Sequence, residues 1–289
     1  MFLQRIALPL LTVVMMVLVN SCDIINPEEP VPSYIHIDKF NLSTTIEQGS
    51  NSSRISDAWV YVDDQLIGAF ELPATMPVLF EGVHKVMVKP GIKVNGIAGT
   101  RAIYPFYTYY SLDIILIPDS VITVNPSITY NAETVFIWKE AFEDGGISIE
   151  TTPFSDTIIE KTLPNAPEVF EGNYSGIIHL DDNHTLFEGR SINSFDLPGG
   201  DTPVFLEMNY KTESEIYMGL FANSSTQSDP VGILTLNKSS TWNKIYINLK
   251  NAINSSTSAT DFQVFFHIEK SSDVTNSVIL LDNIKLVHF

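Results

Sequence analysis

Residues 57–73 read DAWVYVDDQLIGAFELP, and this stretch decides the class of fold. Its side chains alternate, with the aromatic rings of Trp59 and Tyr61 on one face and valines on the other. Alternation of this kind is the pattern of a β-strand. Two aspartates at positions 63–64 interrupt it with residues that favour turns. The segment therefore predicts a β-hairpin.

The rest of the chain repeats this pattern in short β-branched and aromatic runs that end at Gly, Pro, Asn, Asp or Ser. Residues 77–91 predict a second hairpin, which turns at Glu81-Gly82. Helical periodicity is nearly absent; residues 244–254 come nearest, and their first half alternates like a strand. We therefore expect an all-β protein with two β-sandwich units, at residues 34–139 and 140–289.

The composition excludes some classes of partner. The chain has 289 residues, of which 44% are hydrophobic and 17% charged, as in a folded protein with a sizeable core. Its net charge of -18 argues against binding nucleic acid and against electrostatic docking on anionic lipid. A single cysteine, Cys22, excludes an internal disulfide.

The N-terminus reads MFLQRIALPLLTVVMMVLVNSC, with Arg5 ahead of an apolar run at residues 6–19. Residues 1–21 thus have the length and charge of a signal peptide, and the run is short for a membrane-spanning helix. The last four residues, VNSC, resemble the lipobox of bacterial lipoproteins. That resemblance implies acyl chains on Cys22 and a lipid anchor in the outer membrane, on its periplasmic or cell-surface side. The alternative is an ordinary secretory leader with an incidental cysteine.

Residues 22–33 form an acidic tether with three prolines. Its acidic residues resemble the signals that follow the lipidated cysteine in surface lipoproteins of Bacteroidota. Residues 58–91 loosely resemble the small PEGA-type, or prealbumin-like, β-sandwich modules of bacterial surface proteins.

The second unit opens with EAFEDGG and closes with VILLDNIKLVHF. These segments resemble the first and last strands of the jelly-roll carbohydrate-binding modules, which are galactose-binding-like β-sandwiches. The resemblance implies a jelly roll and a structural calcium ion held by Glu143, Asp144 and Asp282. The alternative is that these acids are ordinary surface and turn residues. No other cofactor is expected.

Sugar-binding jelly rolls place aromatic side chains on an exposed sheet face. Alternation nominates candidates in three predicted strands, and mixed aromatic and polar faces suit sugars. Such faces also suit the solvated side of any β-sandwich. The candidate ligand-binding residues are Tyr217, Phe221, Trp242, Tyr246 and Phe265.

Three other groups of residues have a functional and a structural interpretation. The aromatic segment 104–110 is either a ligand platform or, as we favour, a strand packed against the next unit. The segment HLDDNH at 179–184 has the residue types of a metal site, but its sequence is typical of a turn. Glu207 and Glu215 are not expected to form a catalytic pair, and no nucleophile or metalloprotease motif is present.

The sequence therefore predicts a lipid-anchored, non-catalytic envelope protein that acts as a binding module, with carbohydrate as the first ligand class. The main alternative is a structural or accessory subunit of an outer-membrane or surface complex, which meets its protein partner through segment 104–110 or a sandwich edge. A glycan-active enzyme is the least favoured class.

Overall fold

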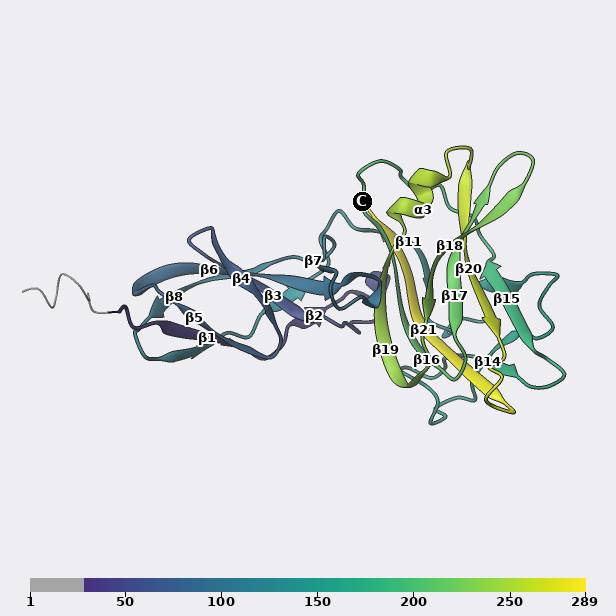
Figure 1. Ribbon diagram of the computed structural model, residues 1–289, viewed down its shortest axis with the longest axis horizontal. Helices are drawn as coiled ribbons and strands as arrows, with labels where there is room; N and C mark the ends of the chain where they lie inside the picture. The colour runs from purple at the N-terminus through teal and green to yellow at the C-terminus, as the bar shows by residue number, and fades with distance from the viewer. Residues whose placement is uncertain (1–28) are drawn as a thin grey trace, which may run out of the picture.

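The computed structural model describes residues 29–289. The leader, Cys22 and most of the tether lie outside the described residues. The described chain forms two β-sandwiches arranged end to end (Figure 1), so the expectation of an all-β fold is confirmed. Within residues 29–289, no helix has the length and apolar character needed to cross a membrane.

The first unit has one sheet of β-strands facing two smaller sheets. The five-stranded sheet has the order β4-β3-β6-β7, with β8 also paired to β6, and it faces sheets β5-β1-β9 and β10-β2. The elements are β1 (Ser33–Ile37), β2 (Asn41–Ser43), η1 (Ile46–Gln48), β3 (Asp57–Val62), β4 (Gln65–Glu71), β5 (Ala74–Val78), β6 (Gly82–Lys93), η2 (Val94–Gly96), β7 (Arg101–Ile103), β8 (Tyr110–Leu116), β9 (Val121–Thr123) and β10 (Ser127–Thr129).

The expected hairpin at residues 57–73 is present as β3 and β4, which pair antiparallel. Asp63 and Asp64 both have positive φ angles, 48° and 65°. Positive φ at both central residues is the requirement of the two-residue turn that matches the twist of a hairpin. Val60 and Val62 point into the core, whereas Trp59 and Tyr61 are half-buried on the other face.

The second expected hairpin, at residues 77–91, is wrong. β5 pairs with β1, and β6 pairs with β3, β7 and β8 in the opposite sheet. The turn at Glu81-Gly82 therefore carries the chain from one sheet to the other. Gly82 has a φ of 96°, a backbone conformation that favours glycine. Such a turn has the same residue types as a hairpin turn, although the strands on either side of it, β5 and β6, do not pair with each other.

The second unit is a jelly roll of two antiparallel sheets. The junction sheet, which faces the first unit, has the order β13-β14-β21-β16-β19, with β11 also paired to β21; the outer sheet has the order β12-β15-β20-β17-β18 (Figure 1). The elements are β11 (Val135–Glu140), β12 (Ile149–Thr151), β13 (Ile159–Lys161), β14 (Gly176–Leu180), β15 (Leu186–Ser191), β16 (Val204–Thr212), β17 (Ile216–Asn223), β18 (Ser228–Leu236), β19 (Ser239–Asn248), α3 (Lys250–Ser255), β20 (Asp261–Glu269) and β21 (Ser277–His288).

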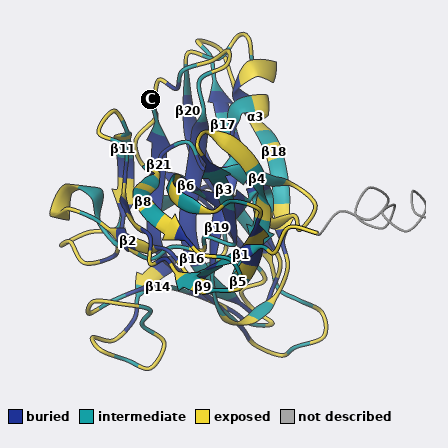
Figure 2. Cartoon of the chain, turned by 90° about the vertical axis from the view of Figure 1, so that its left-hand side faces the viewer, coloured by how far each residue is buried: buried dark blue, intermediate teal, exposed yellow. Residues whose placement is uncertain are grey.

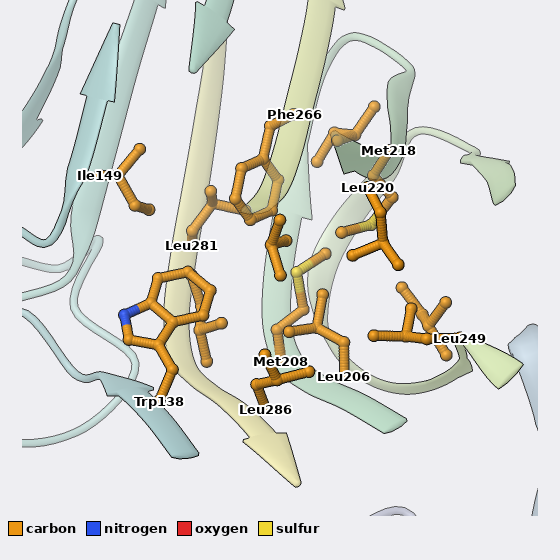
Figure 3. Close-up of a cluster of buried hydrophobic side chains, with 14 of the residues drawn as sticks. Trp138, Ile149, Leu206, Met208, Met218, Leu220, Leu249, Phe266, Leu281 and Leu286 are labelled. Atoms are coloured by element: carbon orange, nitrogen blue, oxygen red, sulfur yellow. The ribbon is translucent and has the colours of Figure 1, made fainter. Parts of the chain in front are cut away.

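The core of the second unit fills the space between these two sheets. Figure 3 shows Leu206, Met208 and Leu286 of the junction sheet facing Leu220 and Phe266 of the outer sheet. These side chains are buried, with exposed fractions of 0–1%. Residues 244–254, which came nearest to helical periodicity, begin as the end of the alternating strand β19 and continue into the short α3.

The boundary between the units lies earlier than expected. The sequence placed it at 139/140, but this position falls inside β11, which pairs along its length with β21 of the second unit. Tyr130 still belongs to the core of the first unit. The connection is therefore the short segment 131–134, which includes a turn with a hydrogen bond from the Thr134 amide to the Asn131 carbonyl.

Aromatic side chains of the first unit pack directly on the junction sheet. Tyr104 and Phe106 are 0% exposed and Tyr107 is 5% exposed. The Tyr104 ring lies 5.3 Å from Phe205 and 4.8 Å from Tyr246, measured between ring centroids. Segment 104–110 thus packs against the next unit, as favoured from the sequence, and its buried rings offer no ligand platform.

A carboxylate is buried at the centre of this junction. Glu207 of β16 is 0% exposed and accepts hydrogen bonds from the hydroxyls of Tyr104 (2.7 Å) and Tyr130 (2.9 Å), both in the first unit. The Lys244 ammonium lies 3.1 Å from the same carboxylate. Burial favours the neutral form of Glu207, but the charges of Lys244 and Lys285 and these hydrogen bonds outweigh it, so its pKa is lowered.

Lys285 completes the network from β21. Its ammonium donates to the Ser50 carbonyl (2.5 Å) and to the Tyr130 hydroxyl (3.4 Å), so it also connects the two units. Burial lowers the pKa of Lys285 to about 8, although Glu207 opposes this shift. The junction therefore holds a buried carboxylate between two lysines and several tyrosine hydroxyls.

The first unit also covers the free edge of the junction sheet. β19 is the last strand of that sheet, and η2 packs beside it. The Asn248 amide donates to the Asn95 side-chain oxygen at 2.8 Å. An edge amide that is already hydrogen-bonded cannot recruit another strand at that position.

Replacing Glu207 by Gln should destabilise the protein by about 3–5 kcal/mol, because two buried lysines lose their counter-charge. Urea unfolding followed by tryptophan fluorescence measures this change. Glu215→Gln, at an exposed glutamate just before β17, is the matched control and should change stability by less than about 0.5 kcal/mol. Equal stability of the two variants would contradict the structural role given to Glu207.

Candidate functional site

The two sheets of the jelly roll differ in what their outward faces contact. The outward face of the junction sheet packs on the first unit, whereas the outward face of the outer sheet lies on the far side of the molecule (Figure 1). A ligand that binds a sheet face therefore has the outer sheet available to it.

Three of the five predicted ligand-binding residues come together on that outward face. Tyr217 and Phe221 lie on β17, and Phe265 lies on the neighbouring β20. The Phe265 ring centroid is 4.9 Å from that of Phe221 and 5.8 Å from that of Tyr217. Phe265 is 2% exposed and forms the floor of this cluster, while Tyr217 is 41% exposed and Phe221 is half-buried.

Two glycines let these rings lie flat on the sheet. A Cβ on Gly219 would come 2.1 Å from the carbonyl oxygen of Val231 on β18 and 2.9 Å from Cε1 of Phe265, and a Cβ on Gly232 would overlap the Tyr217 hydroxyl. Gly219 pairs with Phe265 across β17 and β20, and with Gly232 across β17 and β18. The absence of both side chains thus creates the space into which Phe265 and Tyr217 fold.

Polar side chains surround the aromatic cluster. His267, two residues beyond Phe265, contacts Glu188 through Nδ1 (2.9 Å) and Glu269 through Nε2 (3.4 Å). Arg190 donates to Glu150 at 3.0 Å. Each of these groups keeps donors or acceptors near the rings, which is the mixed apolar and polar lining of a small-ligand site.

A hollow of about 590 Å³ opens at one end of the cluster. Tyr217, His267 and Glu269 line it, together with Lys238 and Asp273, which form an ion pair at 2.6 Å. A second hollow of about 600 Å³ has the same ion pair in its lining and includes Lys211 of β16. The two hollows therefore meet at the Lys238–Asp273 ion pair.

The other two predicted ligand-binding residues do not join this face, so the expectation of one shared aromatic strip is wrong. Trp242 and Tyr246 lie on β19 of the junction sheet. Tyr246 is 2% exposed, and its hydroxyl lies 3.1 Å from that of Tyr107 in the first unit. Trp242 is half-buried, with its ring centroid 5.2 Å from Phe170.

Two of the three acids of the predicted calcium site, Glu143 and Asp282, have protein partners for their carboxylates. Glu143 accepts hydrogen bonds from the backbone amides of Asn173 (2.7 Å) and Tyr174 (3.0 Å). Burial disfavours its charge, but these bonds prevail and lower its pKa. The carbonyl of Asp144 accepts from the Lys161 ammonium, which places a positive charge beside these acids. Within residues 29–289, no group of three or more His, Cys, Asp or Glu side chains is arranged to hold a metal ion.

Asp282 is the most unusual of the three. It is 1% exposed and accepts hydrogen bonds from the Ser175 hydroxyl (2.6 Å) and the Asn283 amide (2.7 Å). Burial raises its pKa to about 7, against the effect of these bonds. Asp282 thus lies in a site that favours the neutral carboxyl, and calcium binding stays a prediction.

The segment 179–184 is a turn in the structure. One Asp181 carboxylate oxygen accepts from the amides of Asn183 and His184, both at 2.8 Å, and Asp182 lies 3.1 Å from the Lys270 ammonium. The turn joins β14 of the junction sheet to β15 of the outer sheet, so it connects the two sheets and does not form a hairpin.

Glu207 and Glu215 do not form a pair. Glu207 is buried at the junction, and Glu215 lies exposed just before β17 of the opposite sheet. Sequence reasoning missed Glu150, Glu188 and Arg190, because β12 and β15 supply them and nothing local places β15 beside β20, with β12 on its other side. The available signal was the alternation in the sequence of residues 186–191, where Glu188 and Arg190 alternate with Phe187 and Gly189.

No protein-family model matches the chain, and neither does any curated protein. Among solved structures, the CBM22-2 xylan-binding domain of Xyn10C from Paenibacillus barcinonensis is 16% identical, with a TM-score of 0.38 over 53% of this chain and 99% of that one. A structure of carbohydrate-binding modules from the β-sandwich superfamily is 14% identical, with a TM-score of 0.37 over 90% of this chain and 99% of that one.

The K3 cleaved adhesin domain of Lys-gingipain from Porphyromonas gingivalis is 17% identical, with a TM-score of 0.36 over 53% of this chain and 98% of that one. At such identities and TM-scores these likenesses say nothing about what this chain binds.

Asp282 should make stability depend on pH in a defined direction. Its folded pKa of about 7 lies above the ordinary value of 3.8, so its contribution to stability is full below pH 3.8 and is lost progressively as the pH rises from there through 7. The loss is a few kcal/mol, at about 1.4 kcal/mol per pKa unit. The Asp282→Asn variant should lack this loss, so its free energy of unfolding should fall less than that of the wild type between pH 5 and pH 8.

The same measurement tests the calcium site. Calcium bound to Asp282 would hold the carboxylate ionised, so added calcium should stabilise the wild type at pH 8 and leave Asp282→Asn unchanged. A chelator supplies the control for calcium that copurifies. Equal effects of calcium on both proteins would contradict a role for Asp282 as its ligand.

Proposed function

We propose that the protein is a lipid-anchored, non-catalytic binding protein of the bacterial outer membrane that takes carbohydrate on the outward face of its outer sheet. The observation that carries the proposal is the aromatic cluster of Tyr217, Phe221 and Phe265, seated on glycine positions and surrounded by polar groups. Pyranose rings present apolar C–H faces and hydroxyl edges, so they need aromatic surface and hydrogen-bonding groups side by side.

The chemistry of the polar groups supports binding without catalysis. Glu188 contacts His267 and also accepts a hydrogen bond from Thr152 at 2.7 Å, and Glu150 accepts from Arg190. A glycosidase needs one carboxyl group as acid and a second as base or nucleophile on either side of the scissile bond. Here the carboxylates contact the basic side chains beside them, an arrangement that fits positioning of polar groups better than proton transfer.

The lipid anchor rests on the sequence. Cys22 follows the apolar run 6–19 and precedes an acidic, proline-rich tether, which supports attachment of acyl chains at that cysteine. We further propose that the chain is a surface lipoprotein of the Bacteroidota type. A protein partner in the envelope is not favoured by segment 104–110, because Tyr104, Phe106 and Tyr107 are buried at the junction and only Tyr109 is exposed.

Removing the exposed ring of the cluster should weaken binding. Tyr217→Ala should reduce affinity for the best glycan by about tenfold, since a stacking contact contributes about 1–1.5 kcal/mol. A glycan array probed with the detergent-solubilised protein identifies the ligand, and titration calorimetry measures the loss. Tyr109→Ala, at a tyrosine of the first unit that is 60% exposed, is the matched control and should bind like the wild type. Equal affinities of the two variants would place the site elsewhere.

The anchor has its own test. Cys22→Ser should move the protein from the membrane fraction to the soluble fraction, because no acyl chains can be attached at serine through a thioether. The circular dichroism spectrum should stay that of a β-protein, since Cys22 lies before the first strand. A variant that still sediments with membranes would show that something other than this cysteine anchors the chain.

A further inference from the structure

Large apolar side chains are exposed around the end of the first unit where the described chain begins. We call this end the N-terminal pole. It is the left end of the molecule in Figure 1, and Figure 2 looks onto it. Six side chains there are 55–70% exposed: Val31, Leu79, Val83, Ile115, Ile117 and Val121.

Strand pairing brings these residues together from distant parts of the sequence. Val83 and Ile115 are directly opposite each other on β6 and β8. On the other side of the sandwich, Val121 pairs with Tyr34 of β1. The Asp119 amide donates to the Pro32 carbonyl at 2.9 Å, so the turn that carries Ile117 lies beside the chain that carries Val31.

The outward face of the large sheet changes character toward this pole. On β8, exposed Ser111 and Asp113 are followed at the next outward position by Ile115, and Ile117 lies directly after the strand. On β6, Val83 occupies the outward position that lies nearest the pole, and exposed Lys85 follows it. Outward positions usually hold polar residues on a solvated sheet, so apolar residues gathered at one end mark a contact surface.

The length of the preceding chain limits what can cover this surface. Val31 is nine residues after Cys22. An extended chain spans at most about 3.3–3.6 Å per residue, so a lipidated Cys22 holds the pole within about 30 Å of its membrane. A tether of this length gives the pole an effective concentration in the millimolar range near the bilayer.

We propose that the N-terminal pole is a membrane-contact surface, whose apolar side chains enter the interfacial region of the bilayer that holds the acyl chains. This inference rests on the proposed anchor at Cys22. Full burial of one aliphatic side chain contributes about 1.5–3 kcal/mol, and the tether removes much of the entropic cost of association. Glu81 and Asp119 flank the apolar residues and are exposed, so the contact is with lipid of no net charge.

This contact fixes the direction in which the protein faces. The N-terminal pole and the outer sheet lie at opposite ends of the molecule (Figure 1). With the pole on the bilayer, the aromatic cluster of Tyr217 points away from the membrane. A glycan outside the membrane then meets the binding face first.

Single cysteines report whether the pole touches lipid. In the full-length lipidated protein, Cys22 has no free thiol, so Ile117→Cys can be labelled with a fluorophore sensitive to its environment. The labelled protein is reconstituted in vesicles of phosphatidylcholine that contain a nitroxide-labelled phosphatidylcholine as quencher. Ile97→Cys is the matched control, because Ile97 is 53% exposed, against 55% for Ile117, and lies beside the junction.

The proposal expects blue-shifted emission and quenching by the labelled lipid at position 117, and neither at position 97. A protein that sediments with the vesicles but gives equal, unquenched emission at both positions would contradict the proposed membrane contact. This holds also if a partner protein covers the pole. A lipid-free protein that does not sediment with vesicles would overturn the anchor. Loss of the quenching in Ile117→Cys when Val83 and Ile115 are both changed to Ser would confirm that these side chains make the contact.

Discussion

The arrangement of the two units depends on one buried carboxylate. Glu207 receives hydrogen bonds from two tyrosines of the first unit and lies against a lysine of its own sheet. Burying a charge costs several kcal/mol unless its partners are in place, and these partners come from both units. The hydrogen bonds from Tyr104 and Tyr130 to Glu207 form only when the two units meet at this junction, so the carboxylate ties the position of one unit to that of the other.

The junction also decides which face of the jelly roll is free. The first unit covers the outward face and the β19 edge of the junction sheet, with Tyr104, Phe106 and Asn95 making the contacts. The outward face of the outer sheet is left uncovered, and its glycines allow Phe265 and Tyr217 to lie against the strands. Packing at one sheet and exposure of the other are thus consequences of the same contact.

The sequence predicted local structure well and pairing poorly. The turn at Asp63 and Asp64 could be predicted because two adjacent aspartates tolerate positive φ angles. The packing of segment 104–110 could be predicted because the segment contains many aromatic residues. The connection between β5 and β6 was wrongly predicted to be a hairpin. Glu81-Gly82 has the sequence of a hairpin turn, but the two strands that it joins belong to opposite sheets. Alternation assigns a side chain to one of two faces but does not say which sheet a strand joins. Tyr246 and Tyr217 therefore looked equivalent, although one is buried at the junction and the other faces solvent.

The position of β21 in the junction sheet constrains the order of folding. This strand pairs with β11, β14 and β16, all of which precede it in the chain. The junction sheet cannot close until β21 has been synthesised. Its pairing with β11 joins residues about 150 positions apart, so this contact forms late. The unfavourable entropy of closing such long loops must be overcome before the sheet becomes stable. Until then, β16 and β11 have unpaired edges, and a chain in this state is exposed to aggregation. Mutations in β21 should therefore lower the yield of folded protein more strongly than equally buried changes in β3.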